Sequence, residues 1–411
     1  MPNDNAESGL IQLEEECRLQ YERPANGDKR IASYSEAARQ QLEENPKYRD
    51  LIRSVILERP DISVPQLFSL PLRSLQGKLM ELPRSTYPET FDEARPWAET
   101  IEFATEPDSP LHEAFVYDLK NRNIQSNVSE RYKAPLMVAN LMRDRLGERP
   151  SVLDVGCSRG HGLKRMAAVR RFPFSKVTAE QLVIDSAGNV ADLVPDHDAT
   201  RAAQFVVNQR FRLGGSLGID IEPAEGEDVK KWARACSFYP SALLDKRAVK
   251  KYDQLDAFDH KNVDFYQADF SDLDIEKFEA EAPVSSFDIV TFSTVLYQVS
   301  EDKREAMFEN AKRLLNPNGI IIIQDFVGID PDDANKLHFY QNWFKEPYIY
   351  RTILLDPKIE NGQLLEIFRW DNGRCNKLLT GSDIDRIVPM GMRALREYSR
   401  ATSLYPSIPG R

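Results

Sequence analysis

The sequence contains few cysteines, and they form no metal-binding pattern. Four of the 411 residues are cysteine, and they lie far apart, at Cys17, Cys157, Cys236 and Cys375. This spacing lacks the close pairs that hold zinc, so we expect no metal site built on cysteine. Free, scattered cysteines are simplest to accommodate in a reducing compartment, and we expect the protein to be cytoplasmic.

Long apolar runs are also missing. No stretch approaches the roughly 20 apolar residues that a membrane-spanning helix needs. The first residues, Met1 to Glu16, are acidic and polar, which does not fit a signal peptide. With 41% apolar and 29% charged residues, the composition is that of a soluble globular protein. The length is sufficient for about two or three domains.

Positive charge is in deficit. The formal net charge is −11, which argues against an extended nucleic-acid-binding surface. Two local basic clusters remain, and we interpret both as solvated helix faces. They comprise Lys164, Arg165, Arg170 and Arg171, and then Arg393, Arg396 and Arg400.

One glycine-rich stretch, residues 151–162, dominates what the sequence does contain. Val152, Leu153 and Val155 form a short apolar run typical of a buried strand. Gly156 and Gly160 follow, and they permit a tight turn with room for a ligand to lie against the backbone. Apolar residues then recur with helical spacing from residue 163 onward. The stretch therefore predicts a strand, a turn and a helix whose N-terminal amides face an anionic group.

The residues around these glycines narrow the class of turn. A phosphate-binding P-loop would carry lysine followed by serine or threonine after its last glycine, where this chain has His161 and Gly162. The dinucleotide pattern G-x-G-x-x-G does not fit the spacing either. The order Leu-Asp-Val-Gly-Cys-Ser-x-Gly resembles the first motif of class I, Rossmann-like, S-adenosylmethionine-dependent methyltransferases.

This resemblance continues to about residue 385 and implies an α/β fold. We expect a Rossmann-like, mostly parallel sheet with helices on both faces and a C-terminal β-hairpin. Its strands are predicted at 216–221, 263–270, 287–292 and 320–326, and the hairpin flanks the turn Asp371-Asn372-Gly373. Further expected elements are a helix over 128–146, a helix over 336–344, a strand over 348–355 and a last helix over 391–400.

The resemblance also implies which residues bind S-adenosylmethionine. The acid that ends the second strand, Asp220, would accept hydrogen bonds from the ribose hydroxyls. Asp269 and the amide of Phe270 would satisfy the adenine ring. The full set of predicted cofactor-binding residues is Asp154, Gly156, Cys157, Ser158, Gly160, Asp220, Ile221, Asp269, Phe270, Ser293 and Thr294. Tyr132 and Lys133, just before the first strand, are further candidates, although a surface or packing role is favoured for both.

The catalytic residues are less evident. Methyl transfer from a sulfonium depends mainly on holding two atoms in line, so a general base is needed only when the acceptor must lose a proton. The polar residues expected near the methyl group are Tyr297, Asp325, His338 and Tyr340, of which Tyr297 and Asp325 are the catalytic candidates. None has a spacing that identifies it as a base.

Residues 172–214 depart from the family pattern as an insertion between the first helix and the second strand. Long insertions in α/β folds often shape the site. We therefore expect either a cap over the methyl end or a contact at the opposite edge of the sheet. Within the insertion, Asp196-His197-Asp198 could suggest a metal, but an N-cap aspartate explains it better.

The N-terminal part is predicted to be separate from the cofactor-binding part. Residues 1–125 form a mainly helical region that is loosely structured to about residue 28, with a short helix over 10–21 as the alternative there. Two helices broken at Asn45-Pro46 and short helices over 67–82 follow. It would serve either as a packing or homo-oligomer contact or as a substrate-binding cap. Residues 126–411 form the methyltransferase domain.

These features predict an S-adenosylmethionine-dependent methyltransferase with an unidentified acceptor. A small-molecule acceptor is favoured because the chain is acidic and the insertion could close a pocket. The alternatives are a protein or RNA methyltransferase and a cofactor-binding scaffold without turnover. An unrelated nucleotide enzyme of Rossmann type is disfavoured by the missing dinucleotide pattern.

Overall fold

The computed structural model describes residues 2–79, 90–125, 128–184, 190–340, 348–358 and 363–387. The chain divides into two compact units. One consists of Met1–Asn127 with Glu225–Gln254, and the other of Val128–Ala224 with Leu255–Arg411. The predicted boundary at residue 125 differs from this division mainly in segment Glu225–Gln254, which belongs to the first unit and not to the methyltransferase part.

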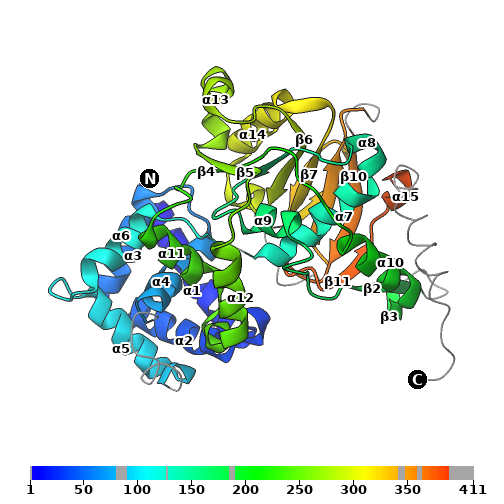
Figure 1. Ribbon diagram of the computed structural model, residues 1–411. Coiled ribbons are helices and arrows are strands. Elements are labelled where there is room, and N and C mark those ends of the chain that lie inside the picture. The colour runs from blue at the N-terminus through cyan, green and yellow to red at the C-terminus, as the bar shows by residue number, and fades with distance from the viewer. Residues whose placement is uncertain are drawn as a thin grey trace. The chain divides into compact units, whose positions relative to one another are not determined.

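The first unit is helical (Figure 1). Its helices are α1 (Pro2–Glu22), α2 (Lys29–Glu44), α3 (Pro46–Glu58), α4 (Val64–Leu79), α5 (Ala94–Thr105), α6 (His112–Asn121), α11 (Glu227–Ser237) and most of α12 (Lys246–Asp256). The expectation of loose structure up to residue 28 is wrong, because Leu10, Leu13 and Cys17 share one helical face and bury it in the unit's core. The predicted short helices over 67–82 are one helix, α4, with Pro71 inside it.

Segment 225–254 joins this unit through buried contacts of α11. Trp232 and Cys236 lie in the same hydrophobic core as the N-terminal helices. The side chain of Gln76 donates to the carbonyls of Ala235 and Phe238 at 2.8 and 2.7 Å. These carbonyls lie at the C-terminal end of α11, where the helix itself provides no N–H donor, so Gln76 supplies the missing hydrogen bonds.

The second unit is built on an eleven-stranded sheet. Across the sheet the strands are β3 (Val190–Asp196), β2 (Thr178–Ile184), β11 (Lys377–Thr380), β10 (Leu364–Trp370), β9 (Tyr350–Leu355), β7 (Leu315–Ile329), β6 (Phe287–Ser293), β1 (Val152–Val155), β4 (Ser216–Asp220) and β5 (Val263–Gln267), with β8 (Leu337–Phe339) paired to β7 alone. From β7 to β5 all pairings are parallel. On the other side of β7 the pairs β7–β9, β9–β10 and β10–β11 are antiparallel, and β11 pairs with β2 in parallel. The α/β class and the C-terminal hairpin are confirmed.

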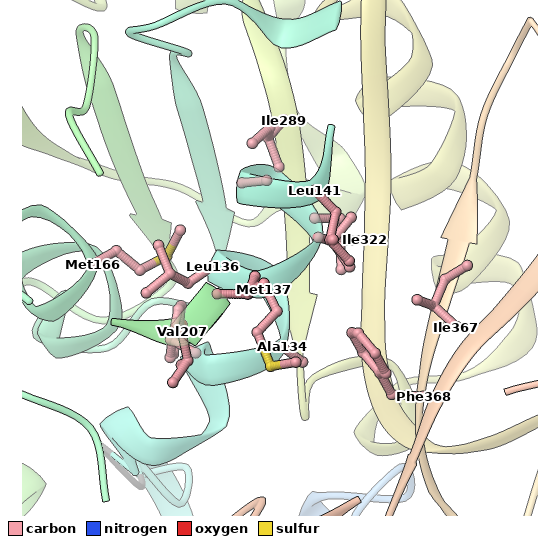
Figure 2. Close-up of a cluster of buried hydrophobic side chains, with 14 of the residues drawn as sticks. Ala134, Leu136, Met137, Leu141, Met166, Val207, Ile289, Ile322, Ile367 and Phe368 are labelled. Carbon is pink, nitrogen blue, oxygen red and sulfur yellow. The ribbon is translucent and has the colours of Figure 1, made fainter. Parts of the chain in front are cut away.

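Helices cover both faces of this sheet. Alternate residues of β7 point to opposite faces, as in any strand that is buried on both sides. Ile322 belongs to one buried cluster with Leu136 and Leu141 of α7 (Lys133–Leu141) and with Val207 of α10 (His197–Val207), and Figure 2 shows Leu141 beside Ile322. Ile321 and Ile323 pack on the other face, where α13 (Ile275–Glu281) and α14 (Glu301–Arg313) contribute Phe278, Met307 and Ala311.

The insertion extends the sheet at one end. Its strands β2 and β3 form an antiparallel pair, and β2 joins β11, at the end of the sheet opposite to β4 and β5. The described part of the insertion therefore lengthens the sheet beyond β11, and its role as a cap over the methyl end or as a contact at the opposite edge stays a prediction. Asp196 accepts hydrogen bonds from the amides of Asp198 and Ala199, which confirms its role as an N-cap.

Three sequence-based predictions of elements need correction or lie outside the description. The predicted helix over 128–146 is a 3₁₀ turn (Ser129–Tyr132), then α7, then α8 (Arg143–Leu146), because α7 is buried on all sides and is not amphipathic. The predicted helix over 336–344 begins instead with the strand β8, which pairs with the long strand β7. The predicted last helix, 391–400, lies outside the described residues.

Among the described residues, no helix combines the length and apolar character that crossing a membrane requires.

Candidate functional site

The glycine turn after β1 is held in an unusual backbone conformation. Gly156, Ser158 and Gly160 have φ angles of 71°, 49° and 65°, and α9 (His161–Ala167) begins directly afterwards. The turn lies at the carboxyl end of β1, between β4 and β6. At this point the chain order reverses across the sheet, which is where open α/β sheets bind ligands.

Protein side chains lie against these glycines. A Cβ atom on Gly156 would overlap Val295, and one on Gly160 would overlap the ring of Phe265. A Cβ on Gly162, in the first turn of α9, would overlap the ring of Tyr132. The sequence predicts that the space beside Gly156 and Gly160 is open for a ligand. In the structure the side chains of Val295 and Phe265 occupy the positions where a Cβ would lie.

Asp154 is buried beneath the turn within a small hydrogen-bond network. Its carboxylate accepts hydrogen bonds from the Tyr132 hydroxyl at 2.8 and 2.7 Å and from the Thr291 hydroxyl at 2.8 Å. Burial raises the pKa of Asp154 to about 7, and the hydrogen bonds from Tyr132 and Thr291 oppose this rise. Tyr132 therefore contacts the turn from below, through Asp154 and Gly162.

We predict that Tyr132→Phe destabilises the protein more at pH 8 than at pH 5. At pH 8 the ionised Asp154 would lose a charge-assisted donor, which costs about 1.5–3 kcal/mol. Because the pKa of Asp154 is about 7 in the folded protein, this carboxyl is protonated and neutral at pH 5 in the folded state. The hydrogen bond from Tyr132 is then not charge-assisted, so its removal lowers the free energy of unfolding by less at pH 5 than at pH 8. Urea unfolding at both pH values measures the difference.

The exposed Tyr21 provides the control, since Tyr21→Phe removes a hydroxyl from a half-exposed side chain on α1. We expect no change in unfolding free energy for Tyr21→Phe at either pH. An equal loss for Tyr132→Phe at pH 5 and pH 8 would contradict the network.

A second carboxylate, Asp256 at the end of α12, braces the turn from the other side. Arg159 Nε lies 2.5 Å and Nη2 3.0 Å from its two oxygens, and His161 Nε2 lies 2.9 Å from one of them. Burial alone would raise the pKa of Asp256, but the hydrogen bonds from His161 and Arg159 outweigh it and hold the pKa below its usual range. Burial lowers the pKa of His161. Asp256 thus fixes both residues that flank Gly160.

We predict that Asp256→Asn lowers the free energy of unfolding by about 1–2 kcal/mol at pH 7, because it removes the charge from a partly buried bidentate pair. Asp253→Asn is the matched control, since Asp253 is half-exposed and lies 3.5 Å from its partner Arg234. We expect less than about 0.5 kcal/mol for the control. Urea unfolding measures both variants. An equal decrease in the free energy of unfolding for Asp256→Asn and Asp253→Asn would show that Asp256 does not stabilise the turn.

Asp220 lies beside the turn at the end of β4. Its carboxylate accepts hydrogen bonds from the amides of Ser158 at 2.7 Å and Glu222 at 3.1 Å. Burial raises its pKa, and those amides oppose the rise. The next side chain, Ile221, is 47% exposed, which is unusual for a large apolar residue and provides a free apolar surface next to the carboxylate.

The neighbouring strand β5 brings the next predicted residues to the same edge. Asp269 caps the 3₁₀ turn Phe270–Asp272 by accepting from the amide and hydroxyl of Ser271 at 2.9 and 2.7 Å. Phe270 is the first residue of that turn, so its amide has no acceptor within it. Cys157 is buried, and its sulfur would lie 2.6 Å from a Cβ on Gly218 of β4.

Ser293 and Thr294 stand at the end of β6. The hydroxyl of Ser293 is buried and has no hydrogen-bond partner among the described residues. Thr294 has a φ of 62°, and its hydroxyl lies 2.7 Å from the Tyr350 hydroxyl. The structure thus gathers the predicted cofactor residues at the carboxyl ends of β1, β4, β5 and β6.

The two catalytic candidates lie in the next loop and strand. Asp325 of β7 is fully buried, and its oxygens accept from the amides of Leu296 at 3.0 Å, Tyr297 at 3.3 Å and Phe326 at 2.8 Å. Burial raises the pKa of Asp325 to about 6, while these amides and the charge of Arg131 lower it. The ring of Tyr297 packs edge-on against Phe326, which in turn packs against Tyr350.

The other candidates have structural contacts. Lys133 is buried, and its ammonium bonds to Ser175, Asn376 and the carbonyl of Cys375. On and after β8, His338 packs against Tyr340, and the Tyr340 hydroxyl accepts from Arg351 at 2.7 Å.

The basic cluster at 164–171 is not simply a solvated face. Arg165 is buried and forms an ion pair of 2.6 Å with Glu130, and Lys164 donates to the carbonyl of Asp256 at 3.0 Å. The second basic cluster, 393–400, lies outside the described residues. Within the described part of the chain, no group of histidine, cysteine or acidic side chains has the geometry to hold a metal ion.

Sequence reasoning missed four residues that the fold brings to the site: Arg131, Asp256, Gln324 and Tyr350. The only local signal was that Arg131 precedes Tyr132, which the sequence did single out. The others come from α12, β7 and β9, and their proximity depends on pairings between segments that are distant in the chain.

Comparison with protein families identifies one match. Residues 245–369 match the model of a methyltransferase domain. A comparison with curated proteins gives no match.

Comparison with solved structures gives weak similarities. PKMT2 from Rickettsia typhi is 17% identical, with 47% of this chain and 25% of that chain covered and a TM-score of 0.22. DesVI from Streptomyces venezuelae is 16% identical, with 56% and 62% covered and a TM-score of 0.24. An S-adenosylmethionine-dependent methyltransferase from Clostridium acetobutylicum is 13% identical, with 68% and 85% covered and a TM-score of 0.25. This chain spans about a quarter of the length of the first of these proteins.

Proposed function

We propose that the chain is a class I, S-adenosylmethionine-dependent methyltransferase that transfers the methyl group of this cofactor to a small-molecule acceptor. The match of residues 245–369 to a methyltransferase domain and the order of the strands around β1 support this proposal. The observation that carries the proposal is the lining at the ends of β6 and β7. There the buried hydroxyl of Ser293 and the buried amide oxygen of Gln324 have no partner among the described residues. Such recessed polar atoms suit a small polar ligand that enters the fold.

The residues present fit the cofactor. We assign the adenosine half to Asp220 for the ribose hydroxyls, Ile221 for the face of the adenine, and Asp269 with the Phe270 amide for its edge. Two features support this: Ile221 is exposed beside Asp220, and the Phe270 amide has no acceptor within its own turn. Each Asp220 oxygen receives one backbone amide, and a carboxylate oxygen has a further lone pair for a ribose hydroxyl.

We assign the methionine half to the glycine turn and to the end of β6. The backbone groups of the turn would contact this half of the cofactor, through Gly156, Cys157, Ser158 and Gly160. The end of β6 would line the site near the reacting methyl carbon, through Ser293 and Thr294. Asp154 stabilises the turn from below through Tyr132.

The cofactor supplies an electrophilic methyl group on a sulfonium, and the chain supplies position. Transfer needs the acceptor atom in line with the methyl carbon, and such positioning can provide about 7–11 kcal/mol of the barrier reduction. The edge-to-face rings of Tyr297, Phe326 and Tyr350 form a rigid wall beside the ends of β6 and β7 and suit the positioning of an acceptor.

We propose a positioning role for Asp325. Three backbone amides use its carboxylate oxygens, so it holds the loop of Leu296 and Tyr297 and is poorly placed to accept a proton from an acceptor. Tyr297 remains our candidate for direct contact with the acceptor.

The test is transfer of labelled methyl from S-adenosylmethionine, using the full chain and cell extract separated by size. We expect label in the fraction of small molecules. Label in the protein or RNA fraction would support the alternative acceptors. Binding of the cofactor without transfer in any fraction would support a scaffold.

A further inference from the structure

A pocket opens among three helices of the first unit. Its volume is about 250 Å³, and side chains from α4, α6 and α11 line it. Helix α4 packs against both α6 and α11 (Figure 1). All the lining residues belong to the first unit, and none of them is assigned to the cofactor. A protein cavity of about 150 Å³ holds benzene, so this pocket is large enough for a single aromatic ring with a polar substituent.

Small residues from each helix leave this space open. They are Gly77 of α4, Ala114 of α6 and Ala235 of α11. A Cβ on Gly77 would lie 3.5 Å from the Cβ of Ala235, so α4 and α11 approach closely at this point. A longer side chain at Ala114 would therefore occupy the pocket.

An ion pair and two aromatic rings form one wall of the pocket. Asp118 accepts hydrogen bonds from the Ser74 hydroxyl at 2.7 Å and from Arg122 Nε at 3.1 Å. The side chains of Asp118 and Arg122 are only 13% and 15% exposed. The guanidinium of Arg122 also lies 5.7 Å and 5.4 Å from the ring centroids of Tyr117 and Trp232. The charges of Asp118 and Arg122 compensate each other, and the two rings add apolar surface.

The two rings differ in their exposure. Tyr117 is 55% exposed, which is unusual for a large aromatic side chain and leaves ring surface available at the pocket. Trp232 is buried, and its indole N–H donates to the carbonyl of Asn123 at 2.8 Å, which fixes the orientation of the ring. An aromatic ligand could pack against both rings without a rearrangement of Trp232.

Positive charge exceeds negative charge in the lining. Lys78 of α4 and Lys231 of α11 join Arg122, whereas the acids are Asp118 and Asp228. Three basic against two acidic side chains leave a surplus of one positive charge, in a chain whose net charge is −11. Lys78 forms no ion pair within the described part of the chain. Its ammonium is therefore available to an anion that enters the pocket.

This charge balance selects the class of ligand. A phosphate group carries about −1.5 to −2 at pH 7, which exceeds the surplus and would bring a second negative charge towards the two acids. An ammonium group would meet the three basic side chains. A carboxylate carries a single negative charge and accepts charge-assisted hydrogen bonds from lysine.

We propose that this pocket binds a small aromatic carboxylate, with its charged group at Lys78 and Lys231 and its ring against Tyr117 and Trp232. The inference does not depend on the proposed function, because all the residues involved lie in the first unit. It assigns to that unit a ligand of its own, distinct from the cofactor.

Calorimetry of the full chain with three probes tests the class of ligand. Benzoate, benzyl alcohol and benzylamine carry the same ring with a negative, a neutral and a positive substituent. We expect benzoate to bind at least about 10-fold more tightly than benzylamine, with benzyl alcohol between them. Absence of benzoate binding, or benzylamine binding as tightly as benzoate, would overturn the proposal.

Two variants test the location. Lys78→Gln should weaken benzoate about 10-fold and leave benzyl alcohol unchanged, because only the charged group of the ligand contacts this lysine. Ala114→Leu should abolish binding of benzoate and benzyl alcohol, and its melting temperature should equal or exceed that of the wild type because the new side chain fills the pocket. Lys29→Gln removes an exposed lysine of the same unit and should change neither affinity.

Circular dichroism checks that the variants fold. Wild-type affinity for benzoate in Lys78→Gln would overturn the role of the lysine, even if Ala114→Leu does not fold. Wild-type affinity in a folded Ala114→Leu would show that benzoate binds elsewhere in the protein.

Discussion

Replacement of Gly156 by valine is expected to abolish measurable cofactor binding while the protein remains folded. The new Cβ would overlap Val295, and an L-residue at a φ of 71° is strained by about 1–2 kcal/mol. The turn must therefore move away from β6, and with it the backbone of Ser158 that meets Asp220. Calorimetry with S-adenosylhomocysteine should show affinity reduced at least about 100-fold, equivalent to roughly 2.7 kcal/mol.

The chain offers a matched control at Gly147. This glycine ends α8 with a φ of 85°, and no atom lies within 4 Å of its would-be Cβ. Gly147→Val introduces backbone strain without overlap, so it should lower the melting temperature and leave affinity unchanged. Circular dichroism checks that both variants fold. Wild-type affinity in Gly156→Val would contradict the placement of the cofactor on this turn.

Replacement of Asp220 by alanine is expected to weaken binding of S-adenosylhomocysteine about 10- to 100-fold. The change removes the acceptor that we assign to the ribose hydroxyls, and each hydrogen bond to a charged group contributes about 1.5–3 kcal/mol. It also releases the Ser158 amide, which Asp220 holds at 2.7 Å. Both losses act in the same direction.

Glu222→Ala is the control for Asp220→Ala, since Glu222 is an acid two residues further along that contributes only its backbone amide to the carboxylate. We expect less than a threefold change in affinity, measured by the same titration. A larger effect at Glu222 than at Asp220 would show that the ribose contact lies two residues beyond the end of β4.

Local patterns were sufficient to predict the elements that build the site. The apolar run of residues 152–155 with the two glycines after it predicted a strand, a turn and a helix, and the structure has all three. The β-branched run from Ile320 to Ile323 predicted the buried strand β7, and Asp371-Asn372-Gly373 predicted the hairpin of β10 and β11. In each case the residues that determine the conformation are neighbours in the chain.

Features that depend on distant segments could not be predicted. Asp256 reaches Arg159 and His161 because α12 ends beside the glycine turn, and no local pattern in either segment indicates this. The length of the gap before the second strand reveals the insertion, but the strand that the insertion joins depends on the pairing of β2 with β11. Segment 225–254 falls within the predicted methyltransferase domain, and the burial of Trp232 and Cys236 places it with the N-terminal helices instead.

The groups that pack against a glycine could not be predicted from the sequence either. A glycine in a turn signals that a side chain is unacceptable there, but not which group fills the space. At Gly162 the neighbour is the ring of Tyr132, whose hydroxyl also binds Asp154. The sequence identified Tyr132 as a candidate for the site but could not show that it packs under the turn.

Calorimetric titration of the full chain with S-adenosylhomocysteine, with NAD⁺ titrated in parallel, tests whether the unit built on β1, β4, β5 and β6 binds S-adenosylmethionine at the ends of these strands. We expect one saturable site for S-adenosylhomocysteine, weakened in Asp220→Ala, and no binding of NAD⁺. Binding of NAD⁺ with no heat from S-adenosylhomocysteine would show that the proposed cofactor is wrong.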